Sequence, residues 1–192
     1  MIGGNHFGQK IMRKGFTLIE LLITMTVFSI VITTSLGLFS SAFREQRKSI
    51  ASIYLLNEAS YVTEYMSRAL RMAKKDLAGA CIDSKYNYQN PGDDTSKIRF
   101  LNYHEKCQEF ILDGNELKVG ISNTSIPPTE KDFLTPSNLV VEDLNFKIVG
   151  GTQDDELQPK VTFILKIKTE ELKPQELNLQ TTISQRDLDV EY

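Results

Sequence analysis

The sequence predicts an α+β fold in which one long N-terminal helix packs on an antiparallel β-sheet head. Three observations predict it: residues 16–43 carry a single charge, no proline occurs between them and Pro91, and apolar residues alternate with polar ones in the second half of the chain. We therefore divide the chain into an N-terminal segment (1–15), an apolar, transmembrane half of the helix (16–43), an amphipathic half of the helix (44–78) and an antiparallel β head domain (79–192).

The composition excludes several classes of protein. The 192 residues are 41% hydrophobic and 24% charged, which excludes a disordered chain, a collagen and a polytopic membrane protein. Two cysteines exclude a cysteine-rich scaffold and a four-cysteine zinc site. The net charge is −3, and residues 76–192 hold 12 basic against 21 acidic residues. This acidic surplus argues against a broad DNA-binding face, and we predict no nucleic-acid partner.

Residues 16–43 form an apolar block that is long enough to span a bilayer. As a helix, the block would be about 42 Å long, against a hydrocarbon core of about 30 Å. It is also longer than the apolar core of an ordinary signal peptide. Its one charge is Glu20, and a carboxylate there costs about 2.5–3.5 kcal/mol on insertion scales, so it should have a partner or a purpose. Basic residues flank the block on both sides, so charge alone leaves its orientation undecided.

The junction before this block carries a resemblance. The residues Lys14-Gly15-Phe16-Thr17-Leu18-Ile19-Glu20 precede a further apolar run that begins Leu21-Leu22-Ile23. This pattern resembles the class III prepilin signal of type IV pilins and type II secretion pseudopilins. The resemblance implies that a prepilin peptidase cuts between Gly15 and Phe16 and methylates the new amino group of Phe16. It also implies that Glu20 helps the subunit to join a filament.

The resemblance implies a location and partners as well. The precursor would lie in the inner membrane as a single-pass protein with its N-terminus inside and its head in the periplasm or outside the cell. Its partners would be the prepilin peptidase and other pilins or pseudopilins in a filament or tip complex. Translation starting at Met12 instead of Met1 would give a four-residue leader, and both starts stay open. The competing hypothesis is a signal-anchored membrane protein with an extracytoplasmic binding head.

Elementary electrostatics gives Glu20 a purpose in such an assembly. Removal of the leader would create a positive amine on Phe16, and Glu20 of one subunit could meet the amine of another in a packed bundle. The pair would offset the burial cost of both charges, whereas either charge alone would be expensive.

The second half of the helix shows an apolar stripe with spacings of three and four residues. The predicted stripe consists of Ile53, Leu56, Ala59, Thr63, Met66, Leu70 and Ala73. The segment 78–80, Ala-Gly-Ala, reads as the stop of the helix, so the helix should run from Phe16 to about Lys75. Gly37 stands where many major pilins carry a kinking proline, which favours a minor pilin or pseudopilin.

Alternating apolar residues predict five or six strands in the head. The segments are centred on Ile98 and Phe100; 107–112; Leu117 and Val119; 144–148; 161–167; and 177–183. Asp113-Gly114 indicates a hairpin turn, Gly150-Gly151 a second turn, and residues 122–138 a polar loop.

Cys81 and Cys107 enclose 25 residues in the part of the chain that would face an oxidising exterior. That compartment favours a disulfide, which would stabilise the head by about 3 kcal/mol. Two free buried thiols are the alternative.

Catalytic chemistry finds little support. His104 is the single histidine after the leader, and no nucleophile motif, phosphate-binding glycine loop or metal-spaced cluster accompanies it. We expect His104 in a surface loop, and predict no catalytic residues, no metal and no cofactor. A hydrolase centred on His104 is a remote alternative. The acidic turns at Asp93-Asp94 and 154–156 lack an EF-hand pattern and read as solvated turns.

Overall fold

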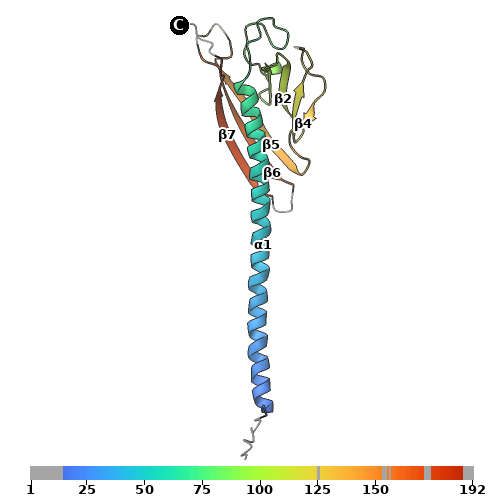
Figure 1. Ribbon diagram of the computed structural model, residues 1–192, viewed down its shortest axis with the longest axis vertical. Helices are drawn as coiled ribbons and strands as arrows, with labels where there is room; N and C mark the ends of the chain where they lie inside the picture. The colour runs from blue at the N-terminus through green and yellow to red at the C-terminus, as the bar shows by residue number, and fades with distance from the viewer. Residues whose placement is uncertain (1–14, 125, 153–154, 156, 171–173, 188–192) are drawn as a thin grey trace, which may run out of the picture. The chain divides into compact units, whose positions relative to one another are not determined.

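The computed structural model confirms the α+β class: one long helix packs on antiparallel sheets (Figure 1). It describes residues 15–124, 126–152, 155, 157–170 and 174–187. The elements are α1 (Leu18–Arg71), η1 (Pro91–Asp93), β1 (Lys97–Leu101), β2 (Cys107–Asp113), β3 (Glu116–Ile121), β4 (Asp132–Phe133), β5 (Leu139–Val149), β6 (Lys160–Thr169) and β7 (Glu176–Ser184). The chain divides into two compact units, with the boundary between Arg47 and Lys48.

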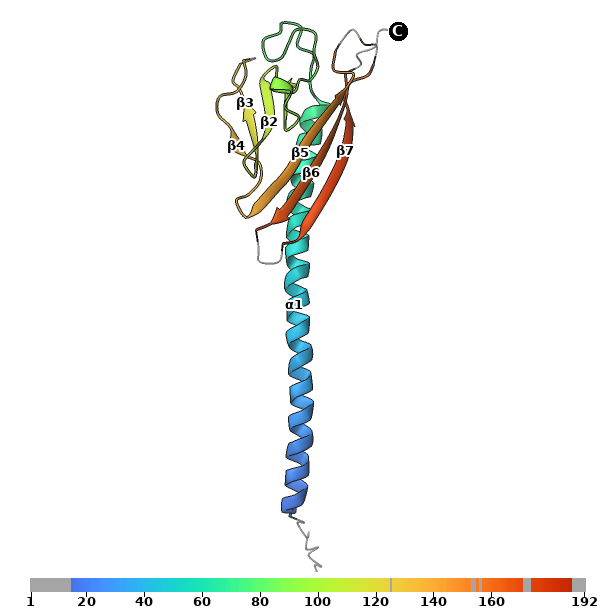
Figure 2. The same cartoon turned by 180° about the vertical axis from the view of Figure 1, so that it is seen from behind.

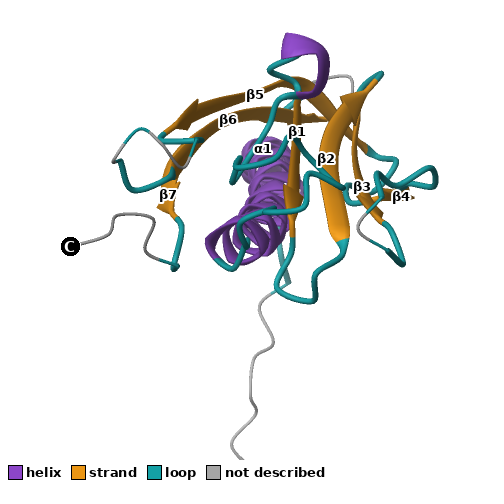
Figure 3. Cartoon of the chain, turned by 90° about the horizontal axis from the view of Figure 1, so that it is seen from above, coloured by secondary structure: helices purple, strands orange, loops and turns teal. Residues whose placement is uncertain are grey.

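The strands form two sheets. The first has the order β1-β2-β3-β4, the second has the order β5-β6-β7, and every pairing is antiparallel. Seen from above, the two sheets flank the C-terminal part of α1 (Figure 3). The predicted hairpin at Asp113-Gly114 is confirmed, since Asp113 pairs with Glu116. Strand β4 was not predicted, because two residues within the polar loop 122–138 are too few to show an alternation.

The helix ends earlier than the sequence predicted. It stops at Arg71 rather than near Lys75, so residues 72–78 belong to a loop and not to the amphipathic helix. Gly79 has a positive φ of 68° but lies eight residues after the helix end and does not cap the helix. Lys74 lies outside the helix and forms a β-bridge with Leu101 of β1, in which the Lys74 N–H donates to the Leu101 carbonyl at 2.8 Å.

Three groups from the head donate hydrogen bonds to backbone carbonyls at and just after this helix end. The Tyr88 hydroxyl donates to the Leu70 carbonyl at 2.6 Å, and the Arg186 N–H donates to the Arg71 carbonyl at 2.8 Å. Gln185 Nε2 donates to the carbonyl of Ala73 at 3.0 Å. Carbonyls at a helix end lack partners within the helix. The first two contacts satisfy such carbonyls, and the third holds the chain just after the helix end. None of them can be read from local sequence.

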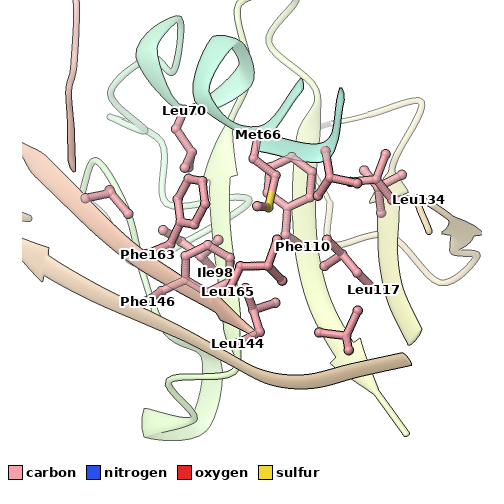
Figure 4. Packing of buried hydrophobic residues seen from close by; sticks show 14 of the residues in the cluster. Met66, Leu70, Ile98, Phe110, Leu117, Leu134, Leu144, Phe146, Phe163 and Leu165 are labelled. Atoms are coloured by element: carbon pink, nitrogen blue, oxygen red, sulfur yellow. The ribbon is translucent and has the colours of Figure 1, made fainter. Parts of the chain in front are cut away.

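The core lies between α1 and both sheets (Figure 4). Met66 and Leu70 of α1 meet side chains from both sheets, among them Phe110 of β2 and Phe163 of β6. These core side chains are at most 1% exposed, so large-to-small changes would leave cavities.

The buried stripe of α1 follows a different track from the predicted one. The buried helix residues are Leu55, Ala59, Val62, Met66 and Leu70. Ile53 and Leu56, which we placed in the stripe, are 55% and 49% exposed. A period of 3.6 residues allows two tracks toward the N-terminus from Met66, and the position of the sheets selects the one through Val62.

The two cysteines form the expected disulfide. Cys81 and Cys107 are bonded, with 5.3 Å between their Cα atoms, and they lie in a small cluster with Ile82 and Leu101. The bond joins the loop after α1 to the first residue of β2. It therefore anchors the region in which the chain passes from helix to sheet.

The buried side chain of Asp76 holds the loop after α1 through backbone hydrogen bonds. Its side chain is 2% exposed and accepts four backbone hydrogen bonds, from the N–H groups of Ala78, Gly79, Cys81 and Ile82, at 2.7–3.1 Å. Burial opposes ionisation of the Asp76 carboxyl, but the backbone donors outweigh it and lower its pKa below the ordinary value. The carboxylate thus acts as the internal anion around which the loop folds.

We predict that Asp76→Asn lowers the free energy of unfolding by about 2 kcal/mol near neutral pH, because an amide offers one acceptor atom to four donors. The lowered pKa means that the carboxylate's contribution is complete above the ordinary aspartate pKa of about 3.9 and is lost as the pH falls through the folded value. The gap between wild type and variant should therefore be constant from about pH 5 to 8 and should close in acid.

Denaturant unfolding of the full-length chain in detergent, followed across pH, measures this difference. Asp132→Asn, at an exposed acid of β4, is the matched control and should change little. Equal stability of Asp76→Asn and wild type at pH 7 would contradict the role given to Asp76.

Candidate processing and assembly site

The Gly15–Phe16 junction lies immediately before the first turn of α1. Residues 15–17 are outside the helix, which begins at Leu18. Phe16 is 80% exposed, and a Cβ atom on Gly15 would meet no atom within 4 Å. The peptide bond between Gly15 and Phe16 therefore lies outside regular secondary structure. The space beside the Gly15 Cα atom is open among the described residues.

Thr17 caps the helix that follows. The Glu20 N–H donates to Thr17 Oγ1 at 3.3 Å, and the Leu21 N–H donates to the Thr17 carbonyl at 3.2 Å. Threonine at the N-cap followed three residues later by glutamate is the spacing of a capping box. Our sequence reasoning missed this role of Thr17, although the Thr-x-x-Glu spacing was there to be read.

The cap explains where Glu20 lies. It is the acidic residue of the first turn of α1, where the helix dipole and the unpaired N–H groups favour a negative charge. Only Thr17 and the first turn separate it in sequence from Phe16. A carboxylate and the amine released by cleavage at Gly15 would therefore both belong to the front end of one helix.

Behind Glu20 the helix surface is apolar. By its length and composition, α1 is long and apolar enough to cross a membrane. Side chains such as Leu18, Phe28 and Leu38 are 61–78% exposed within the chain itself. Such a surface needs a lipid or protein environment to cover it.

Six hydroxyl side chains between Thr24 and Ser35 are satisfied within the helix. They donate to carbonyls three or four residues earlier, for example Thr24 to Leu21 at 2.9 Å and Ser29 to Met25 at 2.8 Å. The same holds for Thr26, Thr33, Thr34 and Ser35. These bonds reduce the cost of placing the hydroxyls in an apolar medium, and Glu20 stays the one charged side chain of the block.

The decisive comparison covers this region. Residues 11–36 match the prokaryotic N-terminal methylation motif. The chain carries a class III prepilin signal, as type IV pilins and pseudopilins do. No curated protein and no solved structure matches the chain significantly. The long apolar helix packed on antiparallel sheets fits a pilin-like fold.

The prepilin signal has direct implications. Such a signal implies processing by a prepilin peptidase and assembly with other pilins in a membrane-associated filament. The matched range contains the Gly15–Phe16 junction, the Thr17 cap and Glu20, whereas the basic residues of the leader lie outside the described residues.

The described residues of the head include His104 and the acidic turn at Asp93-Asp94, which the sequence singled out. His104 lies in the exposed turn between β1 and β2, and its ring centroid is 3.7 Å from that of Tyr103. Within the described part of the chain, no group of three or more His, Cys, Asp or Glu residues could hold a metal ion. Asp94 is occupied by Ser96 and Lys97, and these hydrogen bonds lower its pKa to about 2.

We predict that Thr17→Val weakens the first turn of α1 by about 1 kcal/mol, because valine has the shape of threonine without the capping oxygen. Amide hydrogen exchange at Glu20 in detergent-solubilised chain should be about fivefold faster. Thr17→Ser keeps the hydroxyl and should exchange like wild type. Equal exchange rates in Thr17→Val and Thr17→Ser would show that Thr17 does not cap the helix.

Proposed function

We propose that this protein is a minor pilin or pseudopilin, a structural subunit of a type IV pilus or of a type II secretion-type filament, and not an enzyme. The observation that carries the proposal is the prepilin signal at residues 11–36, placed where an exposed Gly-Phe bond precedes a long apolar helix with one acid on its first turn. The motif by itself indicates a prepilin-type protein and points to a pilin-like structural subunit.

The proposed mechanism begins with processing. The prepilin peptidase cuts between Gly15 and Phe16 and methylates the amine of Phe16, which leaves a positive charge one residue before the Thr17 cap. Before assembly the helix anchors the subunit in the inner membrane, with the N-terminus inside and the head in the periplasm or outside the cell. The exposed apolar side chains of α1 support both an environment of lipid and a later one of neighbouring helices.

Assembly then pairs opposite charges between subunits. Glu20 of one subunit meets the Phe16 amine of another when the helices pack side by side. In an apolar bundle an unpaired carboxylate or amine would be strongly destabilising, whereas the pair offsets most of that cost. Because Glu20 is the single charge among residues 16–43, this pairing also sets the axial register between helices.

Two features favour a minor subunit over a major one. Gly37 lies within an uninterrupted helix where many major pilins have a proline. The disulfide joins Cys81 to Cys107 in the middle of the chain, in an irregular head built from two sheets.

Co-expression with a prepilin peptidase tests the proposal. We expect intact-mass spectrometry to show a chain that begins with N-methyl-phenylalanine at position 16 and has lost the leader. A catalytically inactive peptidase is the control and should leave the leader in place. An uncut chain in the presence of the active peptidase would favour the signal-anchored binding protein instead.

We predict that Glu20→Ala leaves the protein inserted in the membrane and cleaved, but reduces its incorporation into the sheared filament or tip fraction by about tenfold or more, since an unpaired amine is left in the bundle. Thr24→Ala, one turn further along α1, is the matched control and should incorporate normally. Immunoblots of the membrane and filament fractions measure both. Wild-type incorporation of Glu20→Ala would refute the charge-pairing mechanism.

A further inference from the structure

Strand β7 leaves a free edge on the second sheet. It is the terminal strand in the order β5-β6-β7. The Gln185 N–H, directly after the last residue of β7, donates to the Pro159 carbonyl at the start of β6. Backbone groups alternate in direction along an antiparallel strand, so the odd-numbered residues of β7 direct their N–H and C=O groups toward β6. The N–H and C=O groups of Asn178, Gln180 and Thr182 therefore point away from β6, and they have no hydrogen-bond partner among the described residues.

This edge lacks the features that usually protect one. The strand has nine residues, Glu-Leu-Asn-Leu-Gln-Thr-Thr-Ile-Ser, with no lysine and no proline, and its pairing with β6 runs without a bulge. Edge strands in soluble proteins are commonly blunted by lysine, proline, bulges or shortness. A long, regular, nearly uncharged edge is instead a template for an additional strand.

The inner side of β7 is also incompletely covered. Leu177, Leu179 and Thr181 face α1 but are only half-buried, whereas the inward residues of β6 are buried. A groove of about 640 Å³ separates Leu179 from α1. Its helix wall is formed by Ser60, Thr63, Glu64, Ser67, Arg68, Arg71 and Met72.

The helix wall of this groove suits backbone and small side chains. Three of the residues that line it, Ser60, Thr63 and Ser67, carry small hydroxyl side chains, and Thr63 Oγ1 is buried without a hydrogen-bond partner among the described residues. Such an atom is costly unless something supplies a bond. Arg71 also lines the groove, and its carbonyl accepts from the N–H of Arg186, two residues after β7. Arg71 is exposed and has no ion pair within the described part of the chain.

We propose that the β7 edge and this groove accept an extended segment of a different subunit, which adds as an eighth strand and places an acidic side chain against Arg71. This rests on the proposed function. The edge groups of Asn178, Gln180 and Thr182 can be satisfied together only by an extended backbone, and alternate side chains of that segment would enter the groove between Leu179 and α1.

A second copy of β7 is a poorer occupant. In-register parallel pairing would set Glu176 beside Glu176, and like charges directly opposite one another are destabilising. Charge therefore disfavours this pairing and favours a different, acid-bearing segment.

Hydrogen exchange at single-residue resolution tests the proposal. Exchange is compared between full-length chain purified in detergent and the same chain in the filament fraction sheared from its host. The amides of Asn178, Gln180 and Thr182 should exchange at least about tenfold more slowly in the assembled fraction. The amides of Leu177, Leu179 and Thr181, already bonded to β6, serve as the internal reference. Equal exchange of the edge amides in both samples would overturn the proposal.

Two substitutions give an independent readout. Gln180→Pro removes an edge N–H that the β6 ladder does not use, so its incorporation should fall about tenfold, while Gln180→Ala keeps the N–H and should incorporate normally. Arg71→Glu should reduce incorporation and Arg71→Lys should not, which keeps the test valid if the proline variant fails to fold. Normal incorporation of folded Gln180→Pro and Arg71→Glu would overturn the proposal.

The failure of this inference differs from the failure of the proposed function. A chain that is cleaved, methylated and assembled, yet has unprotected edge amides, refutes the eighth strand alone. A chain that is never cleaved refutes the proposed function.

Discussion

A single carboxylate in a block of otherwise uncharged residues is the constraint on which this chain depends. Glu20 follows a capping threonine and sits on the first turn of α1, where the helix end stabilises its charge. The side chains behind it are apolar or carry hydroxyls bonded to their own helix. Every side chain of this block except Glu20 is therefore compatible with a bilayer or with a bundle of helices. The environment of the Glu20 carboxylate thus determines in which of these surroundings the helix is stable.

The C-terminal part of the same helix follows a different rule. From Leu55 to Leu70 one face is buried against two sheets. The carbonyls of Leu70 and Arg71 are bonded by Tyr88 and Arg186, and Gln185 bonds the carbonyl of Ala73 just beyond the helix. The views in Figure 1 and Figure 2 show β5, β6 and β7 beside this part of α1. The N-terminal part of this helix thus exposes an apolar surface, whereas the carbonyls at its C-terminal end are hydrogen-bonded within the head.

The features set by local pattern could be predicted from sequence, and the features set by distant contacts could not. The Gly15–Phe16 junction, the long helix, the hairpin at Asp113-Gly114 and the alternating strands are local. The end of α1 at Arg71 depends on head residues more than 100 positions away, and the track through Val62 depends on where the sheets lie. Asp76 appeared as one acid among many, because its four donors come from a loop whose path has no sequence signature.

The disulfide is buried, and this burial determines that it forms before the head has finished folding. Cys107 is fully enclosed and Cys81 is 3% exposed, so an oxidising enzyme has no access to either sulfur once β1 and β2 have packed. The bond must therefore be made while the newly emerged chain is still open, and a reductant added afterwards would act only as fast as the closed head reopens. Oxidation is thereby tied to a single stage, before the head has closed.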